Sequence, residues 1–344
     1  MINRLASWRC GLWLVLMICS ASTRADESPQ FKPGCRILAT RADAKLLDGD
    51  KVVGTAPAGV SLDVIKVEGT WLWVGGGWLQ AADAVPAEDA VSYFSAQLNR
   101  QRPLFALVGR AKAYSEHRNY QAAIADCNEA LNRSASFVPA LLCRASAFLD
   151  DRNIPLAVHD LDRAIQFDPQ SALAFSLRGQ ARIILHDFDQ AMTDLDTAIR
   201  LDPKSCASWA RRGTVWSNQS NIENALADFN AAVRLNPCYV VALNNRANVW
   251  FKKGEFRRAV DDYTAALQFQ PAADELYFNR AIAWDRLGEH GRAIQDYSET
   301  IRLNPRYGPA YYHRANLRLE LGDRARAADD FKRASALVPG NKTT

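Results

Sequence analysis

Seven arginines and seven aspartates recur at a fixed spacing along this chain. The interval between successive arginines is constant, and so is the shorter interval from each arginine to the aspartate that follows it. The arginines are Arg110, Arg144, Arg178, Arg212, Arg246, Arg280 and Arg314, and the aspartates are Asp126, Asp160, Asp194, Asp228, Asp262, Asp296 and Asp330. A guanidinium can form two parallel hydrogen bonds with a carboxylate, or it can bind an anionic ligand. Because the arginines stand among alanines and aromatic residues, as in "NNRANVW" at 244–250, each charge needs a partner.

Other residue types that carry out catalysis form no pattern. The five histidines fall at unrelated places and have no metal-ligand spacing: His117, His159, His186, His290 and His313. The sequence has no GxSxG motif and no glycine-rich loop that opens a helix. It therefore predicts a protein that is not an enzyme, with no metal site and no cofactor.

The elements that position these charges are marked by prolines at the same period. The prolines are Pro169, Pro203, Pro237, Pro271, Pro305 and Pro339. Extending the period backward gives seven units, which start at Leu104, Val138, Ala172, Cys206, Val240, Asp274 and Gly308. Each unit is predicted to form two helices with apolar residues on facing sides, and the proline stops the second helix in every unit but the first, which has Ala135 in its place. A glycine turn separates the helices in the later units, as at Gly254.

The arginine occupies position 7 of every unit and the aspartate position 23. In an antiparallel helix pair these positions lie at similar heights, so an ion pair is geometrically reasonable. The partner can be the aspartate of the same unit or that of the preceding unit, which for Arg246 means Asp262 or Asp228. Because seven equal copies suit a scaffold better than a binding site, we interpret these residues as structural ion pairs rather than as ligand-binding groups.

The repeat resembles the tetratricopeptide repeat over residues 104–339. Small and large residues stand in the family's places, for example Trp209, Gly213 and Trp216 in one first helix and Ala259, Tyr263 and Ala266 in one second helix. The resemblance implies a helical solenoid, a right-handed superhelix of antiparallel helix pairs with a concave groove. The physical argument agrees, because one helix pair cannot bury its apolar face alone and must stack on a neighbour.

In that family, positions 2, 5, 6, 9, 12 and 13 of the first helix build the groove. The early units carry mostly apolar and small residues there, whereas the last three units are richer in amides and aromatic rings. Amides can pair with an extended peptide backbone, and the rings add apolar contact. The stretch 244–316 is therefore the candidate peptide-binding site, and the alternative is a solvated polar face. Its candidate residues are Asn244, Asn245, Asn248, Phe251, Phe278, Asn279, Tyr312, His313 and Asn316, with Asp285 in the same stretch.

Some tetratricopeptide-repeat proteins clamp the C-terminal carboxylate of cytosolic chaperones, and "NRA" is similar to part of that clamp. Asn248 and Asn279 match two of its asparagines. Asn244, Pro309 and His313 stand where the clamp's cations are expected. We therefore predict no binding of chaperone tails.

Residues 31–86 lack the helical period and read as short strands. "VSLDVIKVEGTWLWV" predicts a hairpin that turns at Glu68-Gly69, and "GGGWL" predicts a turn into another strand. This region resembles the bacterial SH3-like β-barrel, in which some members bind cell-wall peptides. The three tryptophans at 71, 73 and 78 are interpreted as core residues. Residues 87–103 predict a linking and capping helix, a half-repeat with Ala90, Phe94 and Leu98 in the places of a second helix.

Residues 1–25 have the parts of a secretory signal: a basic start, the apolar run "GLWLVLMIC" and a small-residue segment. The sequence thus predicts export to the periplasm, the cell envelope or the medium, and a disordered tail at 340–344. Five cysteines would remain after cleavage: Cys35, Cys127, Cys143, Cys206 and Cys238. We interpret most of them as buried apolar groups. A bridge between repeats is the alternative, and the sequence selects no pair.

Two function hypotheses follow. The first is an exported, non-enzymatic scaffold that mediates protein–protein interaction by binding a peptide or protein segment in its groove. The alternative is a cell-envelope ligand module, whose SH3-like domain binds cell-wall peptide while the repeats recruit a partner. The net charge of +4 falls to +1 without the three arginines of the leader, which gives no electrostatic case for nucleic acid. No second apolar run reaches the length of a membrane span.

Overall fold

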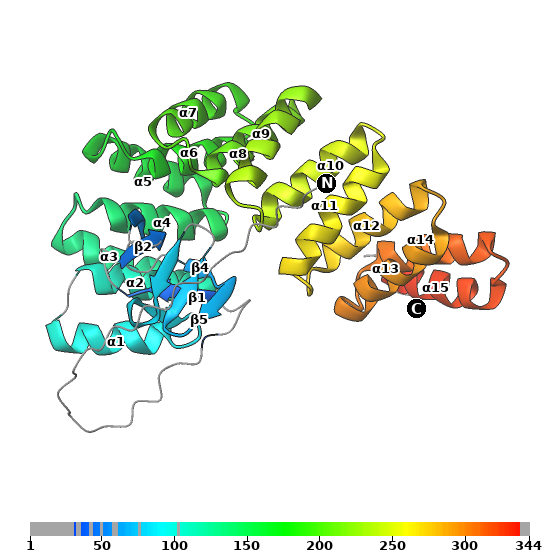
Figure 1. Cartoon of the computed structure of the whole chain (residues 1–344), viewed down its shortest axis with the longest axis horizontal. Helices are drawn as coiled ribbons and strands as arrows, with labels where there is room; N and C mark the ends of the chain where they lie inside the picture. The colour runs from blue at the N-terminus through cyan, green and yellow to red at the C-terminus, as the bar shows by residue number, and fades with distance from the viewer. Residues whose placement is uncertain are drawn as a thin grey trace, which may run out of the picture. The chain divides into compact units, whose positions relative to one another are not determined.

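The computed structural model describes residue 31 and residues 36–40, 44–48, 51–56, 61–74, 77–101 and 104–337. These residues form eight β-strands, one 3-10 helix and fifteen α-helices (Figure 1). The predicted fold class, a mainly α-helical solenoid after a small β-region, is confirmed. The expected leader peptide and C-terminal tail lie outside the described residues. Within the described ranges, none of the helices combines the length and the apolar character that a membrane crossing requires.

Helix pairs follow one another along the solenoid, and each helix packs on its neighbours in sequence. The first helices of the pairs are α2 (Leu104–Glu116), α4 (Val138–Asp150), α6 (Ala172–Ile184), α8 (Cys206–Asn218), α10 (Val240–Lys252), α12 (Asp274–Arg286) and α14 (Gly308–Glu320). The second helices are α3 (Tyr120–Arg133), α5 (Ile154–Phe167), α7 (Phe188–Leu201), α9 (Ile222–Leu235), α11 (Phe256–Phe269), α13 (His290–Leu303) and α15 (Arg324–Ala336).

The turn between the two helices of a unit has the same backbone conformation in all seven units. Its residue at position 15 has a positive φ, between 58° and 84°. Glycine occupies this place in the last three units, where it carries no steric penalty. The first four units use Arg118, Arg152, His186 and Ser220. The sequence signal for the turn was therefore visible only where glycine supplies it.

The solenoid core consists of small residues facing aromatic or branched ones. The alanines at position 20, such as Ala225 and Ala259, are fully buried. Phe229 lies against Gly213, where an added Cβ would come within 3.0 Å of the ring. These contacts explain the small-residue pattern, because a larger side chain would push the paired helices apart.

The N-terminal strands form two antiparallel sheets. Their strands are β1 (Arg36–Ala39), β2 (Ala44–Asp48), β3 (Lys51–Ala56), β4 (Ser61–Asp63), β5 (Lys66–Glu68), β6 (Trp71–Trp73), β7 (Trp78–Gln80) and β8 (Ala84–Pro86). One sheet has the order β4-β1-β8 and the other β3-β2-β7-β6-β5. The expected hairpin is β5–β6, which turns through Gly69 at a φ of 57°. The SH3-like identity of this region stays a prediction.

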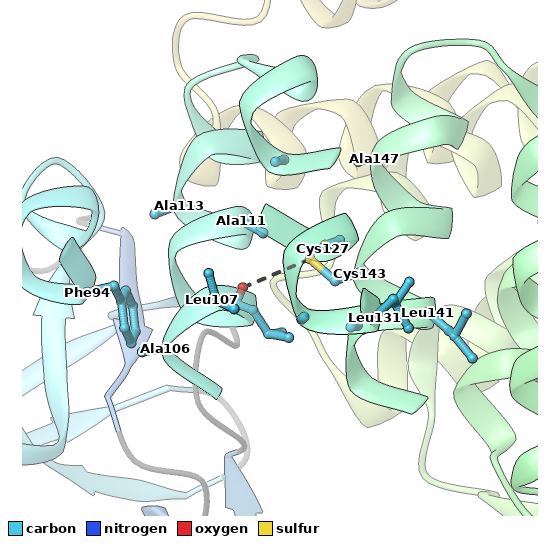
Figure 2. Close-up of a cluster of buried hydrophobic side chains, with 14 of the residues drawn as sticks. Phe94, Ala106, Leu107, Ala111, Ala113, Cys127, Leu131, Leu141, Cys143 and Ala147 are labelled. Carbon is cyan, nitrogen blue, oxygen red and sulfur yellow. Dashed lines mark hydrogen bonds between the residues drawn. The ribbon is translucent and has the colours of Figure 1, made fainter. Parts of the chain in front are cut away.

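Strand β1 joins the sheets to the first repeat. Ile37 and Ala39 belong to the core between the strands, whereas Leu38 belongs to the buried cluster of the helix α1 (Ala90–Gln101) and the first two units. Alternate side chains of a strand point to opposite faces, so β1 is buried on both. Phe94 of α1 is also part of that cluster (Figure 2). The β-region and the solenoid therefore share a hydrophobic core.

The interpretation of the tryptophans as core residues is wrong. The fully buried side chains of β6 and β7 are Leu72 and Leu79. Trp71 and Trp73 flank Leu72 and are only partly buried. Trp73 packs edge-on against Trp78, with ring centroids 5.4 Å apart. The strand alternation places these rings on the face opposite to the core.

Candidate functional site

Each of the seven arginines contacts the aspartate of its own unit through two hydrogen bonds. The Nε and Nη2 groups donate to the two carboxylate oxygens at 2.6–2.9 Å in every unit. The aspartates are buried, with 1–7% of their surface exposed. This two-bond geometry is the strongest arrangement for an arginine and a carboxylate. The hydrogen bond to Asp160, for example, raises the pKa of Arg144, so that its charge stays fixed in the pair.

The third donor of each arginine reaches the preceding unit. The Nη1 group of Arg246 donates to Asn230 Oδ1 at 2.9 Å. The equivalent acceptors at position 25 are Asn128, Asp162, Asp196, Thr264 and Ser298, and Ser95 of α1 accepts from Arg110. From the sequence, the aspartate at position 23 of the preceding unit was an alternative partner for the arginine. In the structure, the arginine contacts the preceding unit through the polar residue at position 25 instead. The arginines thus join neighbouring units and direct their donor groups to the scaffold.

We refer to the surface formed by positions 2, 5, 6, 9, 12 and 13 of the first helices as the first-helix surface. Its amides in α10 have different environments. Asn248 Oδ1 accepts from the hydroxyl of Tyr263 at 2.5 Å, and Asn245 Nδ2 donates to Thr214 Oγ1 at 3.3 Å. Asn244 Oδ1 is buried and has no hydrogen-bond partner among the described residues. The amide nitrogen of Asn248 and the carbonyl oxygen of Asn245 remain for a ligand.

Asn279 of α12 and Asn316 of α14 are both partly exposed. The structure gives neither side chain a hydrogen bond within the described ranges. Phe251 packs on Phe256, with centroids 5.1 Å apart, and lies under the guanidinium of Arg286. The amides are thus available for a ligand, whereas Phe251 is occupied by packing.

Aromatic rings gather between α12, α13 and α14. Phe278 contacts Tyr297, Tyr307 and His313, with centroids 4.9–5.7 Å apart. His313 stacks on Tyr297 at 5.7 Å. Tyr312 contacts His313 edge-on and is 52% exposed. Of the predicted site residues, the structure therefore brings together Phe278, Tyr312 and His313.

His313 cannot replace the missing cation of a carboxylate clamp. Burial lowers its pKa, against a weaker opposite effect of Asp285, so the ring is neutral at neutral pH. The hydroxyl of Tyr297 beneath it is buried without a partner in the described structure. In the preceding unit, the equivalent Tyr263 has Asn248 as its acceptor, but the unit of Tyr297 carries Ile282 in that place.

Sequence reasoning missed Arg211, a cation on the first-helix surface. Arg211 lies at position 6 of its unit, and its Nε and Nη1 groups donate to Gln180 Oε1 at 3.1 Å and Ser176 Oγ at 2.7 Å. Burial lowers its pKa, and the described residues give it no carboxylate partner. The signal was present in the sequence: Arg211 and Arg212 are adjacent, and only Arg212 is needed for the ion pair.

Metal chemistry has no candidate site in the described ranges, because no group of three or more histidine, cysteine, aspartate or glutamate side chains could hold an ion there. Asp285 and His290 do contact each other, at 3.2 Å. This contact is a single histidine–carboxylate pair. The first-helix surface can therefore form hydrogen bonds and apolar contacts, which suit binding.

A family model of the tetratricopeptide repeat matches residues 142–205, 176–239, 211–274 and 244–308. Among solved structures, the chain is similar to the APC/C hetero-tetramer Cut9-Hcn1, with a TM-score of 0.62 and 17% identity over 74% of this chain and 51% of that one. It thus spans about half the length of that structure's chain. A search of curated protein sequences gave no match.

Two further solved structures are tetratricopeptide-repeat proteins. One, from Parabacteroides merdae, has a TM-score of 0.49 and 17% identity, and the match covers 69% of this chain and 94% of that one. The other, from Thermus thermophilus, has a TM-score of 0.49 and 19% identity, with coverages of 53% and 98%. The family-model matches within residues 142–308 and the stacked helix pairs together show that the solenoid of this chain contains tetratricopeptide repeats.

Proposed function

We propose that the protein is an exported, non-enzymatic scaffold that binds an extended peptide segment of a protein partner on its first-helix surface. The observation that carries this proposal is Arg211. The seven arginines at position 7 are neutralised by aspartates, whereas Arg211 lies next to one of them without a carboxylate among the described residues. A partly buried guanidinium held by neutral groups favours an anionic ligand.

Side chains that can form hydrogen bonds with a peptide backbone lie in the units that follow Arg211. Asn245 can still accept a hydrogen bond, Asn248 can still donate through its amide nitrogen, and Asn279 can do both. Tyr312 adds an exposed apolar ring further on. These groups fit an extended segment with an acidic side chain near α8 and an apolar side chain near α14. Export is proposed from the leader-like residues 1–25, and the resulting location is the periplasm, the cell envelope or the medium.

The test is crosslinking capture of the partner from the native envelope fraction with the full chain. A photoreactive residue replaces Asn279 on the first-helix surface, and the matched control replaces Arg234, an exposed residue of the second helix α9. Crosslinked peptides are expected from the Asn279 position and should contain acidic residues. Adding Arg211→Ala should reduce their yield at least tenfold, which corresponds to about 1.4 kcal/mol. Equal capture from both positions, or no effect of Arg211→Ala, would contradict the proposal.

A second candidate function rests on the tryptophans. Trp71, Trp73 and Trp78 are partly exposed on the sheet face opposite to the core, and aromatic rings of this kind can bind apolar or sugar-linked ligands. In this case the β-region binds cell-wall peptide while the repeats recruit a partner. Isolated cell-wall material should then retain the full chain, and Trp73→Ala should abolish retention while Arg211→Ala leaves it unchanged. Retention that survives Trp73→Ala would exclude this function.

A further inference from the structure

Two cysteines from consecutive units meet inside the solenoid. Cys127 lies at position 24 of the first unit, on α3, and Cys143 lies at position 6 of the second, on α4. Both belong to one buried cluster, in which Cys127 is 0% and Cys143 4% exposed. The thiol of Cys143 donates to the carbonyl oxygen of Val108 at 4.0 Å, and Figure 2 shows the side chains of Cys127 and Cys143 between the two helices.

The same two positions face each other elsewhere in the solenoid. One step earlier, the Cβ of a residue in place of Gly109 would lie 2.4 Å from the ring of Phe94 in the half-repeat helix α1. In the last two units, Tyr297 and His313 hold these positions and stack at 5.7 Å. The backbone therefore directs the side chains at position 24 and at position 6 of the next unit toward one another. Cysteines at both places have the facing orientation that a disulfide requires.

Two neighbours of Cys143, Cys127 and Lys112, influence its ionisation. The hydrogen bond from Cys127 and the nearby ammonium of Lys112 lower the pKa of Cys143, although burial acts in the opposite direction. The same hydrogen bond and burial raise the pKa of Cys127. Lys112 forms no ion pair with a carboxylate in the described ranges, and burial lowers its pKa, whereas a thiolate at Cys143 would favour its charged form.

We propose that Cys127 and Cys143 form a disulfide that ties the first repeat to the second when the protein reaches an oxidising compartment. Because both thiols are buried, the reaction takes place while the interface between the first and second units is open. The thiolate of Cys143 then attacks a disulfide-bearing oxidant, forms a mixed disulfide and releases one thiolate of the oxidant. Cys127 then loses its proton to solvent and attacks the sulfur of Cys143, which releases the second thiolate. The two cysteines lose two electrons and two protons, and the oxidant becomes two thiols.

This disulfide would stabilise the interface between the first and second units. Units of a repeat array are held only by their neighbours, so the first interface can open separately from the rest. The bond closes a short loop that runs from Cys127 on α3 to Cys143 on α4. It would therefore keep the first two units, and the β-region that shares their core, in a fixed arrangement. The proposal rests on the proposed export and not on peptide binding.

The experiment uses the full chain, incubated with oxidised or reduced glutathione. Free thiols are alkylated under denaturing conditions, and the unreduced digest is analysed by mass spectrometry. The oxidised sample should contain the Cys127–Cys143 peptide pair as its main crosslink. The pair should persist in Cys206→Ser, the matched control from a different unit, and disappear in Cys143→Ser.

Urea denaturation of the unsubstituted chain gives a second measurement, which does not depend on whether a variant folds. The first two units of the oxidised chain should resist urea more than those of the reduced chain, by roughly a hundredfold in their folding equilibrium. This difference should vanish in Cys143→Ser and remain in Cys206→Ser. The proposal is overturned if Cys127 and Cys143 stay fully alkylatable after oxidation, or if a different cysteine pair is the main crosslink.

Discussion

Replacing Arg246 by alanine tests whether the recurrent arginines stabilise the solenoid. Arg246 donates two hydrogen bonds to Asp262, at 2.8 and 2.6 Å, and one to Asn230 of the preceding unit, at 2.9 Å. The two ion-paired side chains are 18% and 10% exposed. Arg246→Ala therefore removes three hydrogen bonds and leaves a buried carboxylate without its cation.

The expected loss of stability comes mostly from that carboxylate. Removing one partner of a buried ion pair costs about 3–5 kcal/mol, because the remaining charge keeps its desolvation penalty. Since Arg246 is partly open to solvent, water can reach the space it leaves, and the loss should lie at the low end, about 3 kcal/mol. In the double variant Arg246→Ala/Asp262→Ala no charge is orphaned, so its loss should be smaller than that of Arg246→Ala.

The assay is urea denaturation followed by circular dichroism and by tryptophan fluorescence. Both probes are needed because a repeat array can unfold in parts. The control Arg234→Ala removes an exposed arginine of α9 and should change the stability by less than about 0.5 kcal/mol. A loss below about 1 kcal/mol for Arg246→Ala, together with weaker ligand binding, would refute the structural interpretation of this arginine.

Three further variants test particular contacts by denaturation. Ile282→Asn should be more stable than Ile282→Ala by about 1 kcal/mol, because an amide there can accept from the unpartnered hydroxyl of Tyr297, and this difference should disappear in a Tyr297→Phe background. Gly254→Ala should destabilise by about 1 kcal/mol through the backbone alone, since φ is 83° and an added Cβ meets no atom within 4 Å; a neutral result would contradict this. The pKa of His313 is lowered in the folded state, so the unfolded chain binds more protons than the folded chain below pH 6.5. The free energy of unfolding should therefore fall as the pH decreases from 6.5, by at most about 1.4 kcal/mol per pH unit. His313→Gln should remove this part of the pH dependence.

The fold could be predicted from the sequence because the same residue types recur along the chain at a constant interval. A repeat of constant length fixes both helices, their turn and their stacking, so each unit supports the prediction made for the next. The position of Arg246 relative to Asp262 followed from the same period, since an antiparallel pair brings positions 7 and 23 to one height. The choice between the aspartate of the same unit and that of the preceding one did not follow from the period, because both aspartates recur at the same interval as the arginine.

Contacts that occur only once were not predictable in this way. Cys127 and Cys143 are separated by a helix end and a turn, and no sequence pattern selects them from five cysteines. Arg211 was overlooked because its neighbour Arg212 already explained an arginine at that point of the unit. The tryptophans of the β-region were misplaced because a three-residue strand is too short for its pattern to show which face is buried.

Positions 6 and 7 are adjacent in every first helix, yet they have opposite properties. Position 7 is always an arginine, bound to its own unit and to the preceding one, and this constant contact sets the stacking of the units. Position 6 faces position 24 of the preceding unit and changes along the chain, with Gly109, Cys143, Arg211 and His313 as examples. Because the arginine at position 7 makes the constant contact between units, position 6 can carry different residue types, provided that each one fits its partner at position 24, as Gly109 fits Phe94. The chemistry specific to this protein should therefore be sought at position 6, where a substitution changes what the surface binds while the arginine beside it keeps the units together.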